Sequence, residues 1–348
     1  MITDEIEFLV GAFVLLSGIL LLLLVYLIYR KALENRQRRR IEHFKTRMND
    51  KMLHSVLTGE FLRSLQADTK VKKLALEELL SHYAEILEGT EEKNNLNKLA
   101  ESRLTAYYRK SLSSLRWSSR MNALFHIEAF QMEGLKEDII SMLNRSRITK
   151  EEKIRVLTIL AQLQSAEIFD LLSGNYKELS YLEYRNILSR LKRDGFDQFV
   201  LGYHSCQPEL KFAILDLAGL RKELNYLNFV ETIFSVSSGE ERVRSLKAIV
   251  SIGHVRKLDQ YLQLFQSGNW EERMLAAKLA GVLKAEKTLP DLVMLLQDSS
   301  WWVRSQAGQS ITMFPQGKKV LEEVMSDSND SFARDMAWEW INKGVYQT

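Results

Sequence analysis

The apolar residues of this 348-residue chain follow two patterns, one continuous and one periodic. Residues 8–29 carry no charged side chain, and a helix of 22 residues reaches about 33 Å, enough to cross a hydrocarbon core about 30 Å thick. A cleavable signal peptide would need a basic n-region, a shorter apolar core and a small-residue cleavage site, which this segment lacks. We therefore predict a retained transmembrane helix over 8–29, preceded by a short extracytoplasmic N-terminus at 1–7.

The charges that flank this segment predict its orientation. Asp4, Glu5 and Glu7 precede it, whereas eight basic residues lie within the 18 positions that follow it. The positive-inside rule then places the N-terminus outside and the C-terminal domain in the cytoplasm, as in a single-pass protein of the inner or plasma membrane. Contact with anionic headgroups of the lipid bilayer is predicted for Arg30, Lys31, Arg36, Arg38, Arg39 and Arg40. The alternative is that these residues serve only as a topology signal.

Further along the chain, apolar residues recur at helical spacing and the sequence repeats. Each unit has a basic residue near the start of an apolar helix, at intervals of 26 to 35 residues. Three of these basic residues have a tryptophan three positions upstream. The repeat marks are Arg120, Arg155, Arg185, Lys211, Arg244, Arg273, Arg304 and Arg334.

Each unit divides into two helices, of which the second carries one apolar stripe, as in Leu258, Tyr261, Leu262 and Phe265. Such helices bury a continuous core only by stacking on their neighbours. The predicted fold is all-α: a transmembrane helix followed by an α-solenoid of stacked antiparallel helix pairs over 116–348. Residues 30–58 are predicted to form a basic juxtamembrane helical stalk that ends near Gly59. Residues 59–115 are predicted to form a helical N-terminal cap, with helices at 71–87 and 92–112.

The linkers and helix starts of the last units resemble the HEAT-repeat family, in its short form of about 30 residues. Three segments carry the resemblance: Asp298-Ser-Ser-Trp-Trp-Val-Arg-Ser-Gln-Ala307, Asp327-Ser-Asn-Asp-Ser-Phe-Ala-Arg-Asp-Met-Ala337 and, more weakly, Asn269-Trp-Glu-Glu-Arg-Met-Leu-Ala-Ala277. The resemblance is good from Trp270 onward, fair over 113–268 and generic over 48–112. It implies that Asp298, Arg304 and Arg334 link adjacent units by hydrogen bonds.

Composition argues against a nucleic-acid partner. Residues 48–348 contain 40 basic and 40 acidic residues, so the large domain is neutral and the excess positive charge belongs to the juxtamembrane segment. A domain that follows a nucleic-acid backbone would carry a basic balance or a dense basic stripe.

One cysteine, Cys206, excludes an internal disulfide and agrees with a reducing compartment.

No group of residues stands out as catalytic or metal-binding. The six histidines are isolated, and Gly317-Lys318-Lys319 lacks the neighbours of a phosphate-binding loop. We therefore predict no enzymatic activity, no cofactor, no metal and no small-molecule substrate. The alternative, drawn from the HEAT resemblance, is a helical-repeat enzyme similar to bilin lyases or to a DNA glycosylase.

The predicted function is a membrane-anchored, non-enzymatic scaffold or adaptor that binds a protein partner, itself membrane-associated, through the cytoplasmic solenoid. The resemblance makes a bacterial envelope system a reasonable setting, for example a membrane glycosyltransferase complex. Trp338 and Trp340 are the candidate partner-binding residues, because they lie about 200° apart around the last helix and one inward face cannot take both. The alternative is that residues 344–348 fold back over the outer indole.

Overall fold

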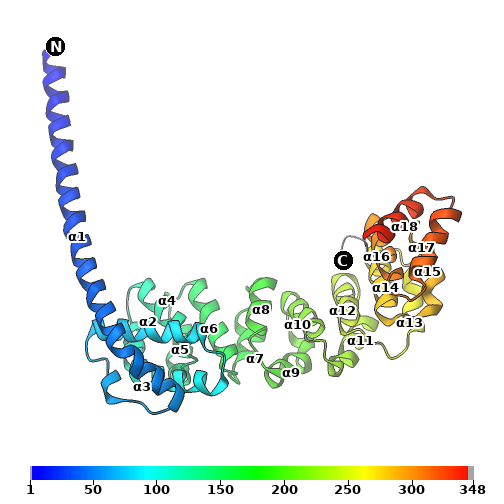
Figure 1. Ribbon diagram of the computed structural model, residues 1–348, viewed down its shortest axis with the longest axis horizontal. Coiled ribbons are helices and arrows are strands. Elements are labelled where there is room, and N and C mark those ends of the chain that lie inside the picture. Colours follow the sequence, from blue (N-terminus) through cyan, green and yellow to red (C-terminus); the bar gives the residue numbers. More distant parts are fainter. Residues whose placement is uncertain (1, 344–348) are drawn as a thin grey trace. The chain divides into compact units, whose positions relative to one another are not determined.

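The computed structural model describes residues 2–343, with the backbone alone at residues 2–10 and 12. Over this range the chain is helical and contains no strand, which confirms the predicted all-α class. The chain divides into two compact units, Met1–Leu163 and Gln164–Thr348 (Figure 1). This boundary falls inside the segment predicted as one solenoid, so the first repeat helices group with the N-terminal helices.

The first unit contains a long N-terminal helix followed by five shorter ones. Its helices are α1 (Ile2–Thr58), α2 (Lys70–Ile86), α3 (Thr90–Leu112), α4 (Trp117–Ala129), α5 (Lys136–Leu143) and α6 (Lys150–Gln162), with 3₁₀ turns η1 (Arg63–Leu65) and η2 (Glu133–Leu135). Helices α2 and α3 begin and end within two residues of the positions predicted from periodicity. α1 ends at Thr58, directly before Gly59, whose φ of +74° suits a glycine.

The second unit alternates the first and the second helices of its repeats. Its α-helices are α7 (Ile168–Asp170), α8 (Tyr181–Leu188), α9 (Arg193–Leu201), α10 (Pro208–Arg221), α11 (Leu227–Val236), α12 (Gly239–Ile252), α13 (Asp259–Leu262), α14 (Trp270–Leu283), α15 (Leu289–Leu295), α16 (Trp301–Ile311), α17 (Gly317–Asp327) and α18 (Ser331–Lys343). Its other helical turns are η3 (Leu171–Asn175), η4 (Tyr203–Ser205), η5 (Leu224–Tyr226), η6 (Gln263–Gln266) and η7 (Glu286–Thr288).

Helix α1 has two halves with different surroundings. From Phe13 on, where side chains are described, α1 is long and apolar enough to cross a membrane, and its most apolar stretch has a mean hydropathy of 2.3 with nothing buried. The core helix of a soluble protein would instead be buried. Figure 1 shows this apolar part of α1 extending away from the helices that pack on its other half.

The second half of α1, which covers the predicted stalk over 30–58, is helical to Thr58 and packs as part of the fold from Ile41 on. Ile41, Met48, Met52 and Val56 are buried and form one stripe against α2 and α3. The side-chain amide of Asn95 on α3 also donates to the Val56 carbonyl (3.0 Å). Only about the first ten residues of the predicted stalk therefore lie outside the core.

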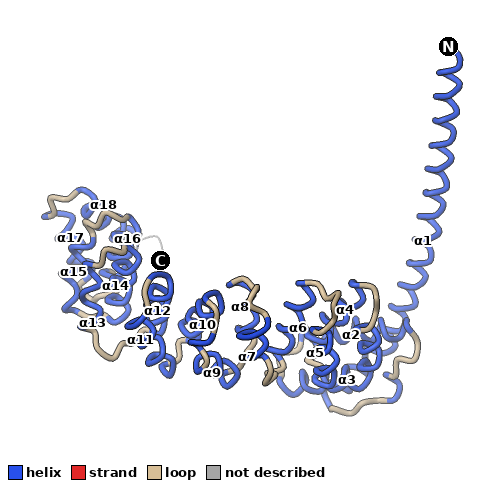
Figure 2. The backbone as a smooth tube through the Cα atoms, turned by 180° about the vertical axis from the view of Figure 1, so that it is seen from behind, coloured by secondary structure: helices blue, strands red, loops and turns tan. Residues whose placement is uncertain are grey.

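In the second unit the first helices of the repeats stack on one another; they are α8, α10, α12, α14, α16 and α18. The second helices, α9, α11, α13, α15 and α17, cover one side of that layer (Figure 2). Small residues allow the close approach. A Cβ added at Gly219 of α10 would lie 2.7 Å from the Ala248 Cα of α12, and one added at Gly281 of α14 would lie 2.9 Å from the Ser310 Cα of α16. The stacked helix pairs that the periodicity predicts are therefore present in this unit.

One predicted stripe has a different register in the structure. Leu264 is buried whereas Leu262 is only half-buried. The reason is that α13 stops at Leu262 and continues as the 3₁₀ segment η6. A 3₁₀ helix has three residues per turn, so Tyr261 and Leu264 share a face.

Candidate functional site

Arginines at the fourth position of a first helix hold consecutive repeats together. The Nη1 atoms of Arg120, Arg273, Arg304 and Arg334 each donate to a backbone carbonyl six residues earlier, at 2.7 to 2.9 Å. Each arginine therefore ties its own helix to the loop that precedes it. Such loop carbonyls would otherwise need water or another donor.

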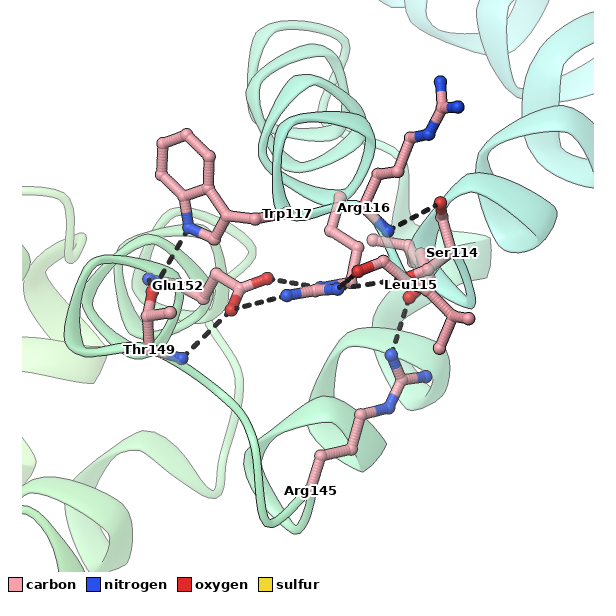
Figure 3. A network of polar contacts seen from close by, with 9 residues as sticks. Ser114, Leu115, Arg116, Trp117, Arg145, Thr149 and Glu152 are labelled. Carbon is pink, nitrogen blue, oxygen red and sulfur yellow. Dashed lines mark hydrogen bonds and ion pairs between the residues drawn. The ribbon is translucent and has the colours of Figure 1, made fainter.

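Arg120 of α4 also binds the next first helix. Its Nε donates to Glu152 Oε1 (2.6 Å), and the Glu152 side chain is fully buried. Glu152 closes a capping box with Thr149, which in turn accepts a hydrogen bond from the Trp117 indole (Figure 3). Burial by itself raises the pKa of Glu152, but the hydrogen bonds from Arg120 and from the Thr149 N–H outweigh it and hold the pKa below its ordinary value.

Asp298 has the same function in the second unit. It accepts two hydrogen bonds from Arg273, at 2.6 and 2.9 Å, and one from the Ser300 N–H at 2.8 Å. The Asp298 carbonyl accepts from Arg304 (2.7 Å). Burial raises the pKa of Asp298, but the hydrogen bonds from Arg273 and Ser300 and the nearby arginine charges lower it overall. Asp298 thus connects α14, its own loop and α16.

In the repeat that begins at α12, the arginine at the fourth position of the first helix is Arg242, and it takes the linking role rather than the predicted Arg244. Arg242 Nη1 donates to the Phe234 carbonyl (2.7 Å) and its Nε to Glu272 Oε1 (2.6 Å) on α14. Arg242, Arg273 and Arg304 are 31 residues apart, so the repeat is more regular than the predicted marks suggested.

The remaining predicted marks have other surroundings. Arg244 and Arg155 lie two positions later in their helices and pair with a carboxylate of the preceding first helix, Asp216 and Glu128 respectively. Lys211 lies 5.3 Å from the centre of the Tyr203 ring. Arg185 is half-buried and lines a small hollow of about 140 Å³ between α8, α10 and α12.

Exposed aromatic side chains gather where α14, α16 and α18 begin. We call Trp270, Trp301, Trp302 and Phe332 the aromatic edge. The Trp302 ring is 60% exposed and packs edge-on against Trp301, with ring centres 4.9 Å apart. Phe332 is 56% exposed and lies under the Arg304 guanidinium at 4.6 Å. Two members of the aromatic edge, Trp270 and Trp301, lie three positions before a repeat mark, and this spacing is the sequence signal for the surface. Trp302 and Phe332 lack that spacing.

The two predicted partner-binding tryptophans differ in exposure. Trp338 is 61% exposed on α18. Trp340 is half-buried against Gly308 of α16, and the Lys343 ammonium lies 4.4 Å from its ring centre. Trp340 therefore belongs to the packing of the last helix, whereas Trp338 is available to a partner. The alternative cap at 344–348 lies outside the described residues.

All six predicted membrane-surface residues are exposed on α1. Three of them approach carboxylates of this chain: Arg30 and Lys31 approach Glu34, and Arg38 approaches Glu42 and Glu78. The other three, Arg36, Arg39 and Arg40, have no ion-pair partner among the described side chains. The guanidinium groups of those three arginines can therefore pair with an external anion.

Reactive groups are few in the described part of the chain. Among the side chains that the structure describes, at residue 11 and over 13–343, no three His, Cys, Asp or Glu side chains are grouped so that they could hold a metal ion. Cys206 is buried, and burial raises the pKa of its thiol to about 11, which keeps it protonated at neutral pH.

Comparison with known proteins supports the repeat interpretation for part of the second unit. The family model described as HEAT repeats matches residues 237–340, the segment that contains Arg242, Arg273 and Asp298. No curated protein matches the chain in sequence. One solved structure that it resembles is of an engineered protein, at 13% identity and a TM-score of 0.33, over 81% of this chain and 80% of that chain.

Proposed function

We propose that this protein is a membrane-anchored, non-enzymatic scaffold that binds a membrane-associated protein through its helical repeats. The observation that carries the proposal is the aromatic edge, together with Trp338. Tryptophan is enriched among the few residues that dominate binding energy at protein interfaces. A soluble repeat surface without partners would not be expected to keep several large rings about half exposed.

The anchor in this proposal is the apolar half of α1. Acidic residues precede it and basic residues follow it, so the positive-inside rule puts both helical units in the cytoplasm. Arg36, Arg39 and Arg40 then lie beyond the headgroup layer but within roughly a Debye length, about 8 Å at physiological salt, of its negative surface, which attracts them. A partner held in the same membrane would meet the repeats at a raised effective concentration.

The partner chemistry follows from the side chains of the aromatic edge. Two indole rings packed edge to face and a phenyl ring against the Arg304 guanidinium favour a protein surface that offers apolar or aromatic side chains. The HEAT resemblance makes a bacterial envelope complex, such as a membrane glycosyltransferase complex, the setting in which we place this partner.

Site-specific substitution tests the proposal. We expect Trp302→Ala and Trp338→Ala, separately, to lower recovery of the partner from detergent-solubilised membranes at least several-fold while leaving the melting temperature of the scaffold unchanged, because both rings are mostly exposed. Phe125→Ala is the matched control, since Phe125 is an exposed aromatic residue on α4, outside the aromatic edge. Equal recovery with all three variants would contradict the proposal.

A further inference from the structure

A basic groove crosses the first unit. One hollow of about 640 Å³ is lined by Lys70 and Lys73 of α2, Tyr107 and Lys110 of α3, and four serines: Ser111, Ser113, Ser114 and Ser119. A second hollow of about 570 Å³ shares Ser113 and Ser114 and continues past Arg145 and Arg147. We call the first hollow the lysine groove. Its volume is in the range of small-molecule sites.

The charges that line the lysine groove are not compensated. None of its lining residues is acidic. Lys70 and Lys110 are exposed and have no ion-pair partner among the described residues, and the Lys73 ammonium lies over the Tyr107 ring at 5.3 Å. These three lysines therefore bring three positive side chains to one hollow. The neutral composition of residues 48–348 conceals this local excess.

Two of the groove's hydroxyl groups keep a proton for a ligand. Ser111 and Ser113 donate to the Tyr107 and Arg109 carbonyls, which uses their protons. Ser114 Oγ instead accepts from the Arg116 N–H (3.2 Å), so its own O–H stays available. Ser119 forms no hydrogen bond through its side chain among the described residues. Ammonium groups beside hydroxyl donors match the acceptor oxygens of a phosphate.

The position of the groove relative to α1 bears on the source of the phosphate. Lys70 lies between Thr69 and Val71, which line a third hollow with Arg39, Arg40, His43 and Phe44 of α1. Arg39 is ten residues beyond Tyr29, which corresponds to about 15 Å along the helix. The headgroup layer extends only about 5 to 8 Å beyond the hydrocarbon core. A headgroup in a flat bilayer therefore falls short of Lys70.

From this geometry we infer that the lysine groove binds the phosphate groups of a soluble ligand with several negative charges. The site is distinct from the aromatic edge, which lies in the other unit. The groove supplies charge and hydrogen-bond donors, and no bond is made or broken there.

Titration of the full-length protein in nonionic detergent micelles with sodium tripolyphosphate tests this inference. We expect saturable binding that weakens as salt is added. Lys70→Gln combined with Lys110→Gln should weaken it about tenfold or more, because two charged donors are lost. The matched control is Lys93→Gln with Lys98→Gln, which removes the same charge from the exposed surface of α3 outside the groove and should leave affinity unchanged. Melting temperatures of both double variants check that they fold.

Three results would overturn the inference. The first is an absence of saturable binding to tripolyphosphate. The second is equal weakening in both double variants, which would indicate attraction to overall charge. The third uses the full-length protein in lipid nanodiscs: binding that persists in phosphatidylcholine but is abolished when phosphatidylglycerol is added would show that lipid headgroups occupy the groove.

Discussion

At the scale of single residues, the junctions between repeats depend on partly buried arginine–carboxylate pairs. Arg120–Glu152, Arg242–Glu272 and Arg273–Asp298 combine an ion pair with a hydrogen bond from the arginine to a preceding backbone carbonyl. Such pairs are often no more stabilising than apolar residues of similar size, but removal of one partner leaves an uncompensated charge in a poorly solvated site. They therefore specify how one repeat meets the next.

Arg242→Ala tests which arginine links α12 to its neighbours. The change leaves the Phe234 carbonyl without its donor and the buried Glu272 carboxylate with the Ser267 hydroxyl but no positive charge, so we expect a loss of about 2 to 4 kcal/mol in unfolding free energy, measured by chemical denaturation. Arg185→Ala is the control, because Arg185 is also half-buried but its side chain donates no hydrogen bond among the described residues. A larger loss in the control would show that the assigned register is wrong.

The lowered pKa of Asp298 leads us to expect a specific change of stability in acid. Its pKa lies below the ordinary value of 3.8 in the folded state, so its contribution is fully present above that value and is lost as pH falls through the lower folded pKa. We expect Asp298→Asn to lower the melting temperature at pH 7. The gap in melting temperature between the variant and the unmodified protein should then narrow as the pH falls below about 4. Melting curves from pH 7 to pH 3 measure this, and a difference that grows on acidification would contradict the assignment.

At the scale of elements, first helices approach closely where a glycine faces a small residue. Gly281 of α14 would place a Cβ against Ser310 of α16 at both its Cα and its Cβ. Backbone atoms cannot move aside as a flexible side chain can. The separation of these two helices therefore depends on the missing side chain.

Gly281→Ala should for this reason destabilise the protein by about 1 to 3 kcal/mol, even though alanine is the better helix former by about 1 kcal/mol. Gly174→Ala offers the comparison, since a Cβ there meets nothing within 4 Å. The measurement is the melting temperature of each variant. A Gly281→Ala protein that melts at or above the temperature of the unmodified protein would show that α14 and α16 are not in close contact.

Helical periodicity was sufficient to predict the elements but not all of their partners. The bounds of α2 and α3 follow from their apolar spacing. The burial of Ile41 and Met48 does not, because it depends on which helices fold back against α1. Arg242 and Arg244 are both compatible with a period near 30, and only the position of the Phe234 carbonyl separates them. Net charge could not reveal the lysine groove, because the tertiary fold gathers residues from α2 and α3.

At the scale of the whole molecule, the proposed scaffold combines an anchor with binding surfaces in its two units. In that proposal the apolar half of α1 is the anchor, the aromatic edge and Trp338 are the protein-binding surface in the second unit, and the lysine groove is an anion site in the first. The anchor and its orientation are the central part of the proposal, because they decide which compartment both units face.

The most direct test asks on which side of the membrane the C-terminus lies, in a protein that resists extraction at alkaline pH. Two fusions of the full-length chain are compared, one to green fluorescent protein and one to alkaline phosphatase, which is active only outside the cytoplasm. We predict that both fusions stay in the washed membranes, with fluorescence from the first and no phosphatase activity from the second, because the basic residues after Tyr29 stay inside. Release of the protein into the soluble fraction, or an active phosphatase, would contradict the account.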